Sequence, residues 1–165
     1  MDIFLIRHAL AEERSLFQLK KLSDSMRPLT KKGRDKFKNK AEKLKTIIGD
    51  VDLIISSSYL RARQTAEIIS DLYPNIKIMT SPDLVPSSNP QDFANWSAKY
   101  IQKKIKRIII VGHEPQLSVF ASWLLFGSQQ SRIQIKKGGC IAIKVNKLMT
   151  KNNGILKWAI TSKII

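Results

Sequence analysis

Residues 1–12 read MDIFLIRHALAE and combine an apolar run with charged and polar residues that follow it directly. Ile3 to Ile6 form a short, nearly unbroken apolar run, which predicts a strand buried on both faces of a mainly parallel sheet. The run ends abruptly at Arg7 and His8. Because ligand sites in open α/β sheets lie just beyond the carboxyl ends of strands, this guanidinium and imidazole mark a candidate site. A surface arginine and a hydrogen-bonded core histidine would fit the same pattern.

A length of 165 residues predicts a single domain over residues 1–165, with a sizeable core. No apolar stretch approaches the length of a membrane span, and the apolar residues before Arg7 are too few for the core of a signal peptide. We therefore expect a cytoplasmic protein without a membrane partner. The single cysteine, Cys140, excludes an internal disulfide, and its strand-like surroundings predict a small buried apolar residue.

The charge balance is strongly basic, with 29 Lys and Arg against 13 Asp and Glu and a net charge of +16. Such a charge attracts nucleic acid, acidic membrane surfaces, phosphorylated ligands or acidic proteins without deciding among them. A lysine-rich composition can also reflect a coding bias. Few aromatic residues are interleaved with the basic ones to stack on bases, which weakens the nucleic-acid interpretation without removing it.

The rest of the chain alternates predicted strands and helices, as in an α/β fold with a parallel sheet. Strands are expected over 51–56, 76–79 and 107–111, and helices over 31–48, from the serines at 57–58 to before Pro74, over 91–104 and over 115–126. The last part predicts two or three strands, 133–135, 139–145 and 156–161, with a turn at 152–154. These form a hairpin at the edge of the sheet. Residues 9–27 are predicted to be an irregular loop that can hold a helical turn, and residues 81–90 a surface loop.

Three strand-to-helix junctions carry residues suited to phosphate chemistry: Arg7 and His8 in the first, Arg61 in the second and His113 in a later one. The chain has only these two histidines, and both occupy the same kind of position. Two guanidiniums can neutralise and orient phosphate oxygens through charge-assisted bonds. One imidazole can attack phosphorus, while the other, protonated, stabilises the developing charge.

These residues resemble the histidine phosphatase superfamily, also called the phosphoglycerate mutase-like family, whose signature is Arg-His-Gly at the end of the first strand. The resemblance covers nearly the whole chain. Its motifs are LIRHA at 5–9, DSMRPLT at 24–30 with Gly33, SSYLRARQTA at 57–66 and VGHEP at 111–115. Within the family the chain is similar to the small SixA-type protein phosphohistidine phosphatases. The resemblance implies a three-layer α/β/α fold whose mainly parallel central sheet has an antiparallel edge.

The resemblance also assigns roles to residues. His8 is expected to be the nucleophile that becomes transiently phosphorylated, Arg7 and Arg61 to hold the phosphoryl oxygens, and His113 to complete the pocket as a charged donor. Arg27 is expected either to contact phosphate or to pair with a carboxylate. Arg63 should stay in solvent. No metal ion and no organic cofactor is implied.

The chain departs from the family pattern at two points. Ala9 replaces the signature glycine, which bears on any positive φ or close backbone approach there. Larger members carry a carboxylic acid on an insertion after the second helix, and no matching insertion is present. Asp83 and Asp24 are candidates for that acid, with turn-forming or capping roles as the alternative.

The missing insertion bears on the substrate. An alkoxide leaving group needs a proton in the transition state, whereas the imidazole of phosphohistidine, with a pKa of about 6.5, leaves with little help. A short chain therefore suits phosphohistidine on a signalling protein, which the net charge would attract if that protein is acidic. Phosphate would be the product.

Three alternatives remain open at this point: a phosphatase of a small phosphate ester, a basic nucleic-acid-binding module and a regulatory protein without turnover. Nothing in the sequence fixes the oligomeric state.

Overall fold

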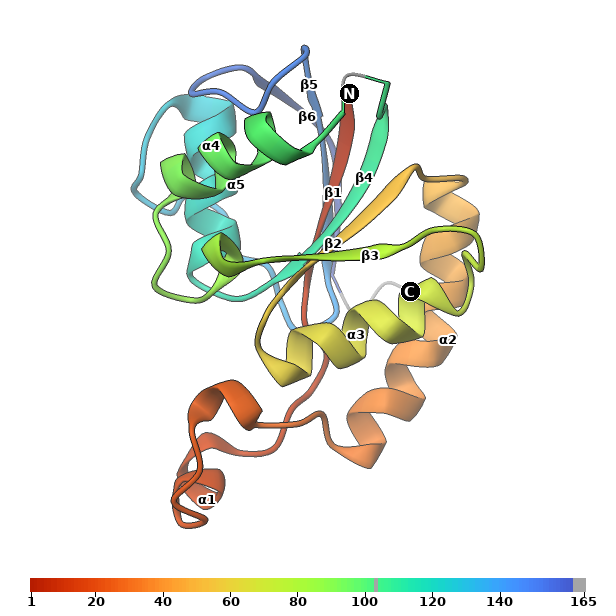
Figure 1. Cartoon of the computed structure of the whole chain (residues 1–165), viewed down its shortest axis with the longest axis vertical. Helices are drawn as coiled ribbons and strands as arrows, with labels where there is room; N and C mark the ends of the chain where they lie inside the picture. Colours follow the sequence, from red (N-terminus) through yellow and green to blue (C-terminus); the bar gives the residue numbers. More distant parts are fainter. Residues whose placement is uncertain (103, 162–165) are drawn as a thin grey trace.

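The computed structural model describes residues 1–102 and 104–161, and within them six strands form one sheet. The strands are β1 (Asp2–Arg7), β2 (Leu53–Ser57), β3 (Ile78–Ser81), β4 (Arg107–Gly112), β5 (Cys140–Val145) and β6 (Gly154–Ile160), in the order β3-β2-β4-β1-β5-β6. The first four run parallel, β5 runs antiparallel to β1, and β6 antiparallel to β5 (Figure 1). The predicted mainly parallel sheet with an antiparallel edge is confirmed.

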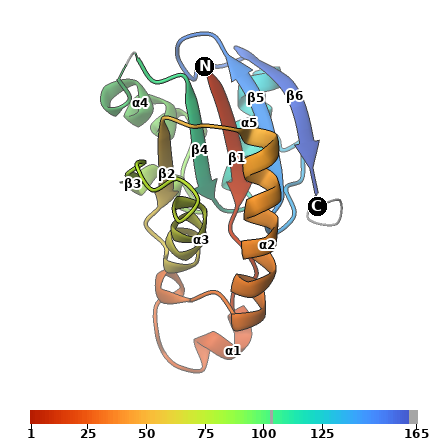
Figure 2. The same ribbon diagram turned by 90° about the vertical axis from the view of Figure 1, so that its right-hand side faces the viewer.

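Helices cover both faces of this sheet, which makes the fold the expected three-layer α/β/α arrangement. One face carries α2 (Lys31–Ile48) and α3 (Leu60–Ser70), and the other carries α4 (Pro90–Tyr100) and α5 (Gln116–Phe126) (Figure 2). Three shorter helices complete the described chain: α1 (Arg14–Gln18) and the 3₁₀ turns η1 (Asp24–Met26) and η2 (Pro82–Leu84). None of the described helices is long and apolar enough to cross a membrane.

Strand β1 divides the core between the two layers. Ile3 and Leu5 belong to the apolar cluster under α4 and α5, and Phe4 and Ile6 to the cluster under α2 and α3. Side chains alternate across a strand, so an apolar run rather than an alternating pattern is what a doubly covered strand requires. All four residues are buried. Burial of each such side chain stabilises the fold by about 1.5–3 kcal/mol.

Helix α2 has the predicted bounds because the sequence marks both of its ends. The Thr30 hydroxyl accepts a hydrogen bond of 2.9 Å from the Gly33 backbone N–H, which satisfies one of the free donors of the first turn. Gly49, at φ 73°, ends the helix in a conformation that side chains disfavour. The buried face consists of Gly33, Phe37, Ala41, Leu44 and Ile48.

Several predicted elements differ from the structure in place, extent or kind. The strand predicted over 76–79, for example, lies at Ile78–Ser81. The helix predicted over 91–104 ends at Tyr100, where Ile101 turns to an extended backbone; Lys103 lies outside the described residues. Residues 133–135 form no strand. Side chains take the place of a neighbouring strand there, because the Ile135 N–H donates to Glu114 and its carbonyl accepts from Arg7. An alternating apolar pattern does not reveal whether the backbone of a segment pairs with a strand or with side chains.

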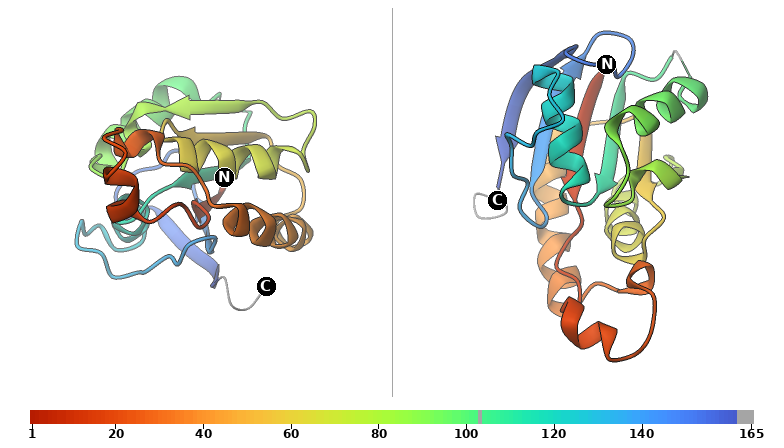
Figure 3. Two further views of the ribbon diagram at one scale, coloured as in Figure 1. Left: turned by 90° about the horizontal axis from the view of Figure 1, so that it is seen from below. Right: turned by 90° about the vertical axis from the view of Figure 1, so that its left-hand side faces the viewer.

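The fold brings the ends of β1 and β4 together. These strands are adjacent and parallel, with Arg7 opposite Gly112, so the residues that follow each of them emerge at the same edge of the sheet. The segment with α1 and η1 projects beyond that edge and lies beside it (Figure 3). The candidate site at the end of β1 is therefore built from segments that are far apart in the sequence.

Candidate active site

The two histidines lie side by side just past the ends of β1 and β4. The His8 N–H donates to the Gly112 carbonyl at 3.0 Å, which continues the β1–β4 ladder by one bond. The ring centroids of His8 and His113 are 5.1 Å apart, and both side chains are buried. The two imidazoles thus lie close enough to contact the same tetrahedral anion.

The orientation of the His8 ring is set by one hydrogen bond on each nitrogen. Nδ1 lies 2.7 Å from the Ala9 carbonyl oxygen, which can only accept, so Nδ1 carries the proton. Nε2 is then the acceptor for the Arg61 Nε–H at 3.3 Å. The lone pair of Nε2 is therefore directed at a guanidinium rather than at a base.

The buried guanidinium of Arg61 is held in place by several contacts. It belongs to the first turn of α3, and only 2% of its surface is exposed. Its Nη1 donates to the Asp24 carbonyl at 2.8 Å, its Nη2 lies 3.1 Å from the Asp24 carboxylate, and its guanidinium lies 4.9 Å from the centroid of the Tyr59 ring. These contacts fix the plane of the guanidinium beside His8.

His113 is anchored through one nitrogen and has the other without a partner. Nε2 lies 2.9 Å from the Ser57 hydroxyl at the end of β2, and the Tyr59 ring meets the imidazole edge-on at 5.2 Å between centroids. Nδ1 is buried and has no hydrogen-bond partner in the structure. A buried polar atom without a partner is uncommon, so Nδ1 is suited to contact a ligand.

Arg7, like His113, has one nitrogen that is hydrogen-bonded and another that has no partner. Its Nη1 donates to the Ile135 carbonyl at 3.0 Å, while its buried Nε has no hydrogen-bond partner in the structure. Burial lowers the pKa of Arg7, and the nearby Glu114 carboxylate opposes this. Together with Arg61 and Arg27, Arg7 acts electrostatically on the pKa of His8. All five residues predicted for the site therefore lie within one electrostatic environment.

Arg27 forms the carboxylate pair that was the alternative to a phosphate contact. Its Nε lies 2.8 Å from one Asp24 carboxylate oxygen, and its Nη1 donates to the Glu12 carbonyl at 2.7 Å. Arg14 meets the second carboxylate oxygen of Asp24 at 3.3 Å. Asp24 thus contacts three guanidiniums in the structure, among them that of Arg61.

These contacts decide the protonation state of Asp24. Burial raises the pKa of Asp24, but hydrogen bonds from Arg27 and Arg14 and the charge of Arg61 outweigh this and hold the pKa at about 2. The carboxylate is therefore ionised at neutral pH and has no proton to donate. This is contrary to the role of general acid that made Asp24 a candidate.

Burial and nearby positive charge favour the neutral form of both histidines. Burial lowers the pKa of His8 to about 3, with the Ala9 carbonyl opposing it and the charges of Arg61, Arg7 and Arg27 adding to it. Burial, His8 and Arg61 lower the pKa of His113 to about 2. Burial and these neighbouring charges thus disfavour the charged form that was expected of His113. A dianionic phosphoryl group between the rings would favour the protonated form again.

The alanine in place of the signature glycine fits without strain. Lys21 and Asn152 are the positive-φ residues other than glycine in the described chain, so Ala9 needs no conformation that favours glycine. Its N–H donates to the Thr65 hydroxyl at 3.1 Å, and this hydroxyl donates to the Arg61 carbonyl at 2.7 Å. Thr65 therefore ties the residue after His8 to the helix that carries Arg61.

Sequence reasoning missed three positioning residues: Ser57, Tyr59 and Thr65. All three lie in the motif that supplies Arg61, and Thr65 is four residues after Arg61 and so on the same side of α3. This four-residue spacing from Arg61 could have identified Thr65 as a positioning residue from the sequence. The contacts of Ser57 and Tyr59 with His113 cross between strands and could not be seen in local sequence.

The remaining candidates lie apart from these contacts. Asp83 is in η2, where the Ser81 hydroxyl accepts from its backbone N–H, which matches a turn-forming role. Arg63 is exposed, as predicted. Cys140 is fully buried, and burial raises the pKa of its thiol, so it packs as an apolar residue. Within residues 1–102 and 104–161, no three His, Cys, Asp or Glu side chains are grouped to hold a metal ion.

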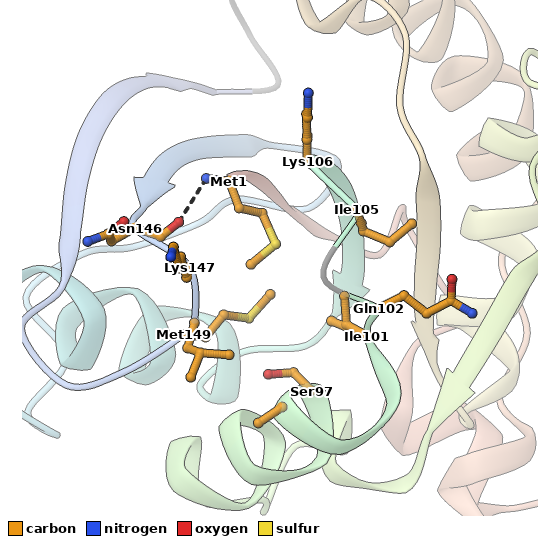
Figure 4. A pocket seen from close by; sticks show the side chains of 11 residues that line it. Met1, Ser97, Ile101, Gln102, Ile105, Lys106, Asn146, Lys147 and Met149 are labelled. Atoms are coloured by element: carbon orange, nitrogen blue, oxygen red, sulfur yellow. Dashed lines mark hydrogen bonds between the residues drawn. The ribbon is translucent and has the colours of Figure 1, made fainter.

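A cavity of about 560 Å³ lies at the other end of the parallel strands, remote from both histidines. It is lined by Met1 before β1 and Lys106 before β4, and the side chains of Met1 and Met149 turn toward each other in it (Figure 4). Its lining is mostly apolar and includes none of the predicted site residues. The histidine pair, and not this cavity, is therefore the candidate active site.

Known proteins share this arrangement. The histidine phosphatase superfamily (branch 1) matches residues 3–86. An uncharacterized protein of Picosynechococcus sp. (strain PCC 7002) is 30% identical over 146 residues, which cover 87% of this chain and 85% of that protein. The phosphohistidine phosphatase SixA of Escherichia coli (strain K12) is 25% identical over 162 residues, covering 96% and 92%. The structure of the protein histidine phosphatase SixA complexed with tungstate superposes with a TM-score of 0.82 at 22% identity over 99% of both chains, which confirms the fold.

Proposed function

The chain belongs to the histidine phosphatase superfamily and is a phosphatase, and we propose that it hydrolyses phosphohistidine on a signalling protein through a phosphorylated His8. The observation that carries the proposal is the state of His8. Its Nε2 lone pair is free of a proton and lies beside the Arg61 guanidinium, while the nearby carboxylate, Asp24, has no proton to donate. Such a site favours a leaving group that needs no strong acid.

In the first step, Nε2 of His8 attacks phosphorus in line with the N–P bond of the substrate. That bond breaks as the new Nε2–P bond forms, and its electron pair passes to the substrate ring, which is protonated on its other nitrogen and so leaves as neutral imidazole. The His8 ring then carries a positive charge. The Ala9 carbonyl, which already accepts from Nδ1–H at 2.7 Å, stabilises it.

In the second step, water attacks phosphorus of phospho-His8. The Nε2–P bond breaks, its electron pair returns to Nε2, and inorganic phosphate leaves after a proton of the attacking water passes to solvent. Arg7 and Arg61 hold the equatorial oxygens in both steps, and His113, protonated in the presence of the phosphoryl dianion, donates through Nδ1. No residue in this sequence of steps has to act as a strong acid.

The test is a comparison of substrates. The purified protein is assayed with a phosphotransfer protein phosphorylated on histidine and with a panel of p-nitrophenyl phosphate, a sugar phosphate and a nucleotide. We expect a higher kcat/KM for the phosphohistidine protein than for any ester. Esters hydrolysed faster, with the phosphohistidine protein left intact, would show that the substrate is a small phosphate ester.

His8→Ala provides the second arm of the same experiment. We expect it to abolish both turnover and the acid-labile phosphoenzyme seen in a rapid quench, because it removes the imidazole nitrogen that accepts from Arg61 and is proposed to attack phosphorus. Full activity in His8→Ala would rule out this nucleophile. Salt-sensitive binding of DNA or RNA that survives His8→Ala, in a protein without phosphatase activity, would favour the nucleic-acid module instead.

A further inference from the structure

A groove of about 280 Å³ begins at the residue that follows His8. Three lysines, Lys36, Lys40 and Lys137, line it together with the apolar side chains of Leu10 and Phe37. Lys36 and Lys137 are exposed, Leu10 is 39% exposed, and Phe37 is buried. We call this feature the basic groove; it combines an apolar surface with positive charge on two separate segments of the chain.

Both walls of the basic groove are connected directly to the catalytic strand end. Ala9 and Leu10, which line it, follow His8 in the chain, and the Gly138 N–H donates to the Arg7 carbonyl at 3.0 Å. The groove therefore begins within two residues of His8 along the chain. Helix α2, which contributes Gly33, Lys36, Phe37 and Lys40 to the lining of the groove, is seen along its length in Figure 2.

The charges on α2 are placed where folding alone disfavours them. Residues 31–45 hold eight lysines and arginines and two acidic residues. The first turn of α2 contains Lys31 and Lys32 and no acidic residue, although the positive end of the helix dipole lies there. Lys32, Lys36 and Lys40 follow each other at intervals of four, a spacing at which like charges destabilise a helix.

The titration of Lys40 reflects this crowding. Burial lowers the pKa of Lys40, and the charges of Lys36 and Lys43 lower it further. An anionic surface placed against this part of α2 would relieve the repulsion among the three lysines. Within α2 itself, Asp35 and Glu42 are the acidic residues.

We propose that the basic groove docks an acidic segment of the phosphorylated protein, in which an apolar side chain flanked by carboxylates lies next to the phosphohistidine. The inference rests on the proposed function and adds the surface by which the substrate protein is selected. The carboxylates pair with Lys36 and Lys137, and the apolar side chain lies against Leu10. A nucleic acid fits less well, because Phe37 is only 1% exposed and cannot stack on a base.

The test compares two double variants with the same change in charge. Lys36→Glu/Lys137→Glu alters the basic groove. Lys147→Glu/Lys151→Glu alters exposed lysines in the turn between β5 and β6, away from the groove. Each is assayed with a histidine-phosphorylated phosphotransfer protein of negative net charge and with phosphoimidazole, which has the same bond but no protein surface.

We expect the groove variant to lose about tenfold in kcat/KM toward the phosphoprotein, mainly through KM, and to retain its activity toward phosphoimidazole. The control variant should change by less than about threefold toward either substrate. An equal loss in both variants would show that total charge and not the groove matters. No loss in the groove variant would also overturn the proposal.

A binding measurement separates this inference from the proposed function. The Kd of the unphosphorylated phosphotransfer protein is measured with the parent and both variants, and so is the Kd of a homopolymeric RNA. A parent that binds the protein but hydrolyses neither substrate would refute the proposed function, while a binding loss confined to the groove variant would still support docking. Loss of RNA binding alone, with no binding of the protein, would overturn the docking proposal in favour of nucleic acid.

Discussion

At the scale of single residues, the site is organised by contacts that divide the two histidines into different roles. His8 has its proton on Nδ1, held by a carbonyl, and presents Nε2 to Arg61. His113 is tied through Nε2 to Ser57 and keeps Nδ1 without a partner. His8 thus offers a nitrogen without a proton, whereas His113 offers a nitrogen without a hydrogen-bond partner. The difference arises because the other nitrogen of each ring has a different partner, the Ala9 carbonyl for His8 and the Ser57 hydroxyl for His113.

Arg61→Ala should remove preorganised positive charge from the site. We expect kcat toward a phosphohistidine substrate to fall by about 10²–10³-fold, since a lost donor of this kind costs about 3–4 kcal/mol of transition-state stabilisation. Steady-state and single-turnover rates measure the effect. Arg63→Ala is the matched control, because Arg63 is exposed on the same helix two residues away and should leave the rate unchanged. Similar losses in both variants would contradict the role of Arg61.

Asp24→Asn should change how stability depends on pH. The folded pKa of Asp24, about 2, is below its ordinary value of 3.8, so ionised Asp24 stabilises the fold above about pH 4, and this contribution disappears as pH falls toward 2. We expect Asp24→Asn to lower the free energy of unfolding by about 1–2 kcal/mol at pH 7, a figure reduced for the partial exposure of the carboxylate.

Urea denaturation of the parent and Asp24→Asn across pH 2.5–7 measures this. The difference between the two proteins should shrink as pH falls, while titration of the histidines affects both alike. A difference that stays constant with pH would mean that the ion pairs of Asp24 with the arginines do not contribute.

At the scale of elements, the site depends on how closely α2 approaches the loop after β1. A Cβ built on Gly33 would lie 2.1 Å from the Leu10 carbonyl oxygen, which is backbone and cannot turn aside. The Thr30 N–H also donates to this carbonyl, at 3.0 Å. The first turn of α2 therefore fixes the position of the segment that begins with Ala9.

Gly33→Ala should consequently disturb both stability and catalysis. Overpacking against backbone costs about 1–3 kcal/mol of unfolding free energy, although alanine is otherwise the better helix former. We expect kcat to fall as well, because the displaced loop carries the carbonyl that orients His8. Thermal denaturation and activity assays are compared with Lys38→Ala, an exposed site on the same helix. A Gly33→Ala protein as stable and active as Lys38→Ala would show that the loop adapts without cost.

At the scale of the whole molecule, the net charge of +16 surrounds a site that itself binds an anion. Long-range attraction between this charge and an acidic partner raises the association rate, and salt screens it over a Debye length of about 8 Å at physiological ionic strength. A small phosphoramidate gains less from the field, because it carries few charges.

Raising the salt concentration from about 20 to about 200 mM should therefore lower kcat/KM toward an acidic phosphoprotein by about tenfold or more. The value for phosphoimidazole should change much less. Stopped-flow or initial-rate measurements at constant pH provide the comparison, with sucrose as a control for viscosity. If both substrates respond equally to salt, the charge acts at the phosphate site alone and not through the surface of the partner.

Much of the fold could be predicted because local pattern determines local structure. The apolar run of β1 indicates a strand covered on both faces, and the Thr30 cap and Gly49 mark the ends of α2. The position of Arg7 and His8 after one parallel strand and of His113 after another predicts that they meet, since parallel strands end at the same edge. For residues 133–135 the pattern was misleading, because the partners of Ile135 are side chains of Arg7 and Glu114.

Neighbouring residues are enough to predict which elements form and which side chains lie at the strand ends, because backbone preferences and apolar periodicity are local properties. Tertiary contacts, in contrast, set which nitrogen of His8 has no proton, favour neutral His113 and complete the three arginine contacts of Asp24. Protonation depends on burial and on charges a few ångströms away. Arg61 is 37 residues from Asp24 and 53 from His8 in the chain, and only folding brings it to both.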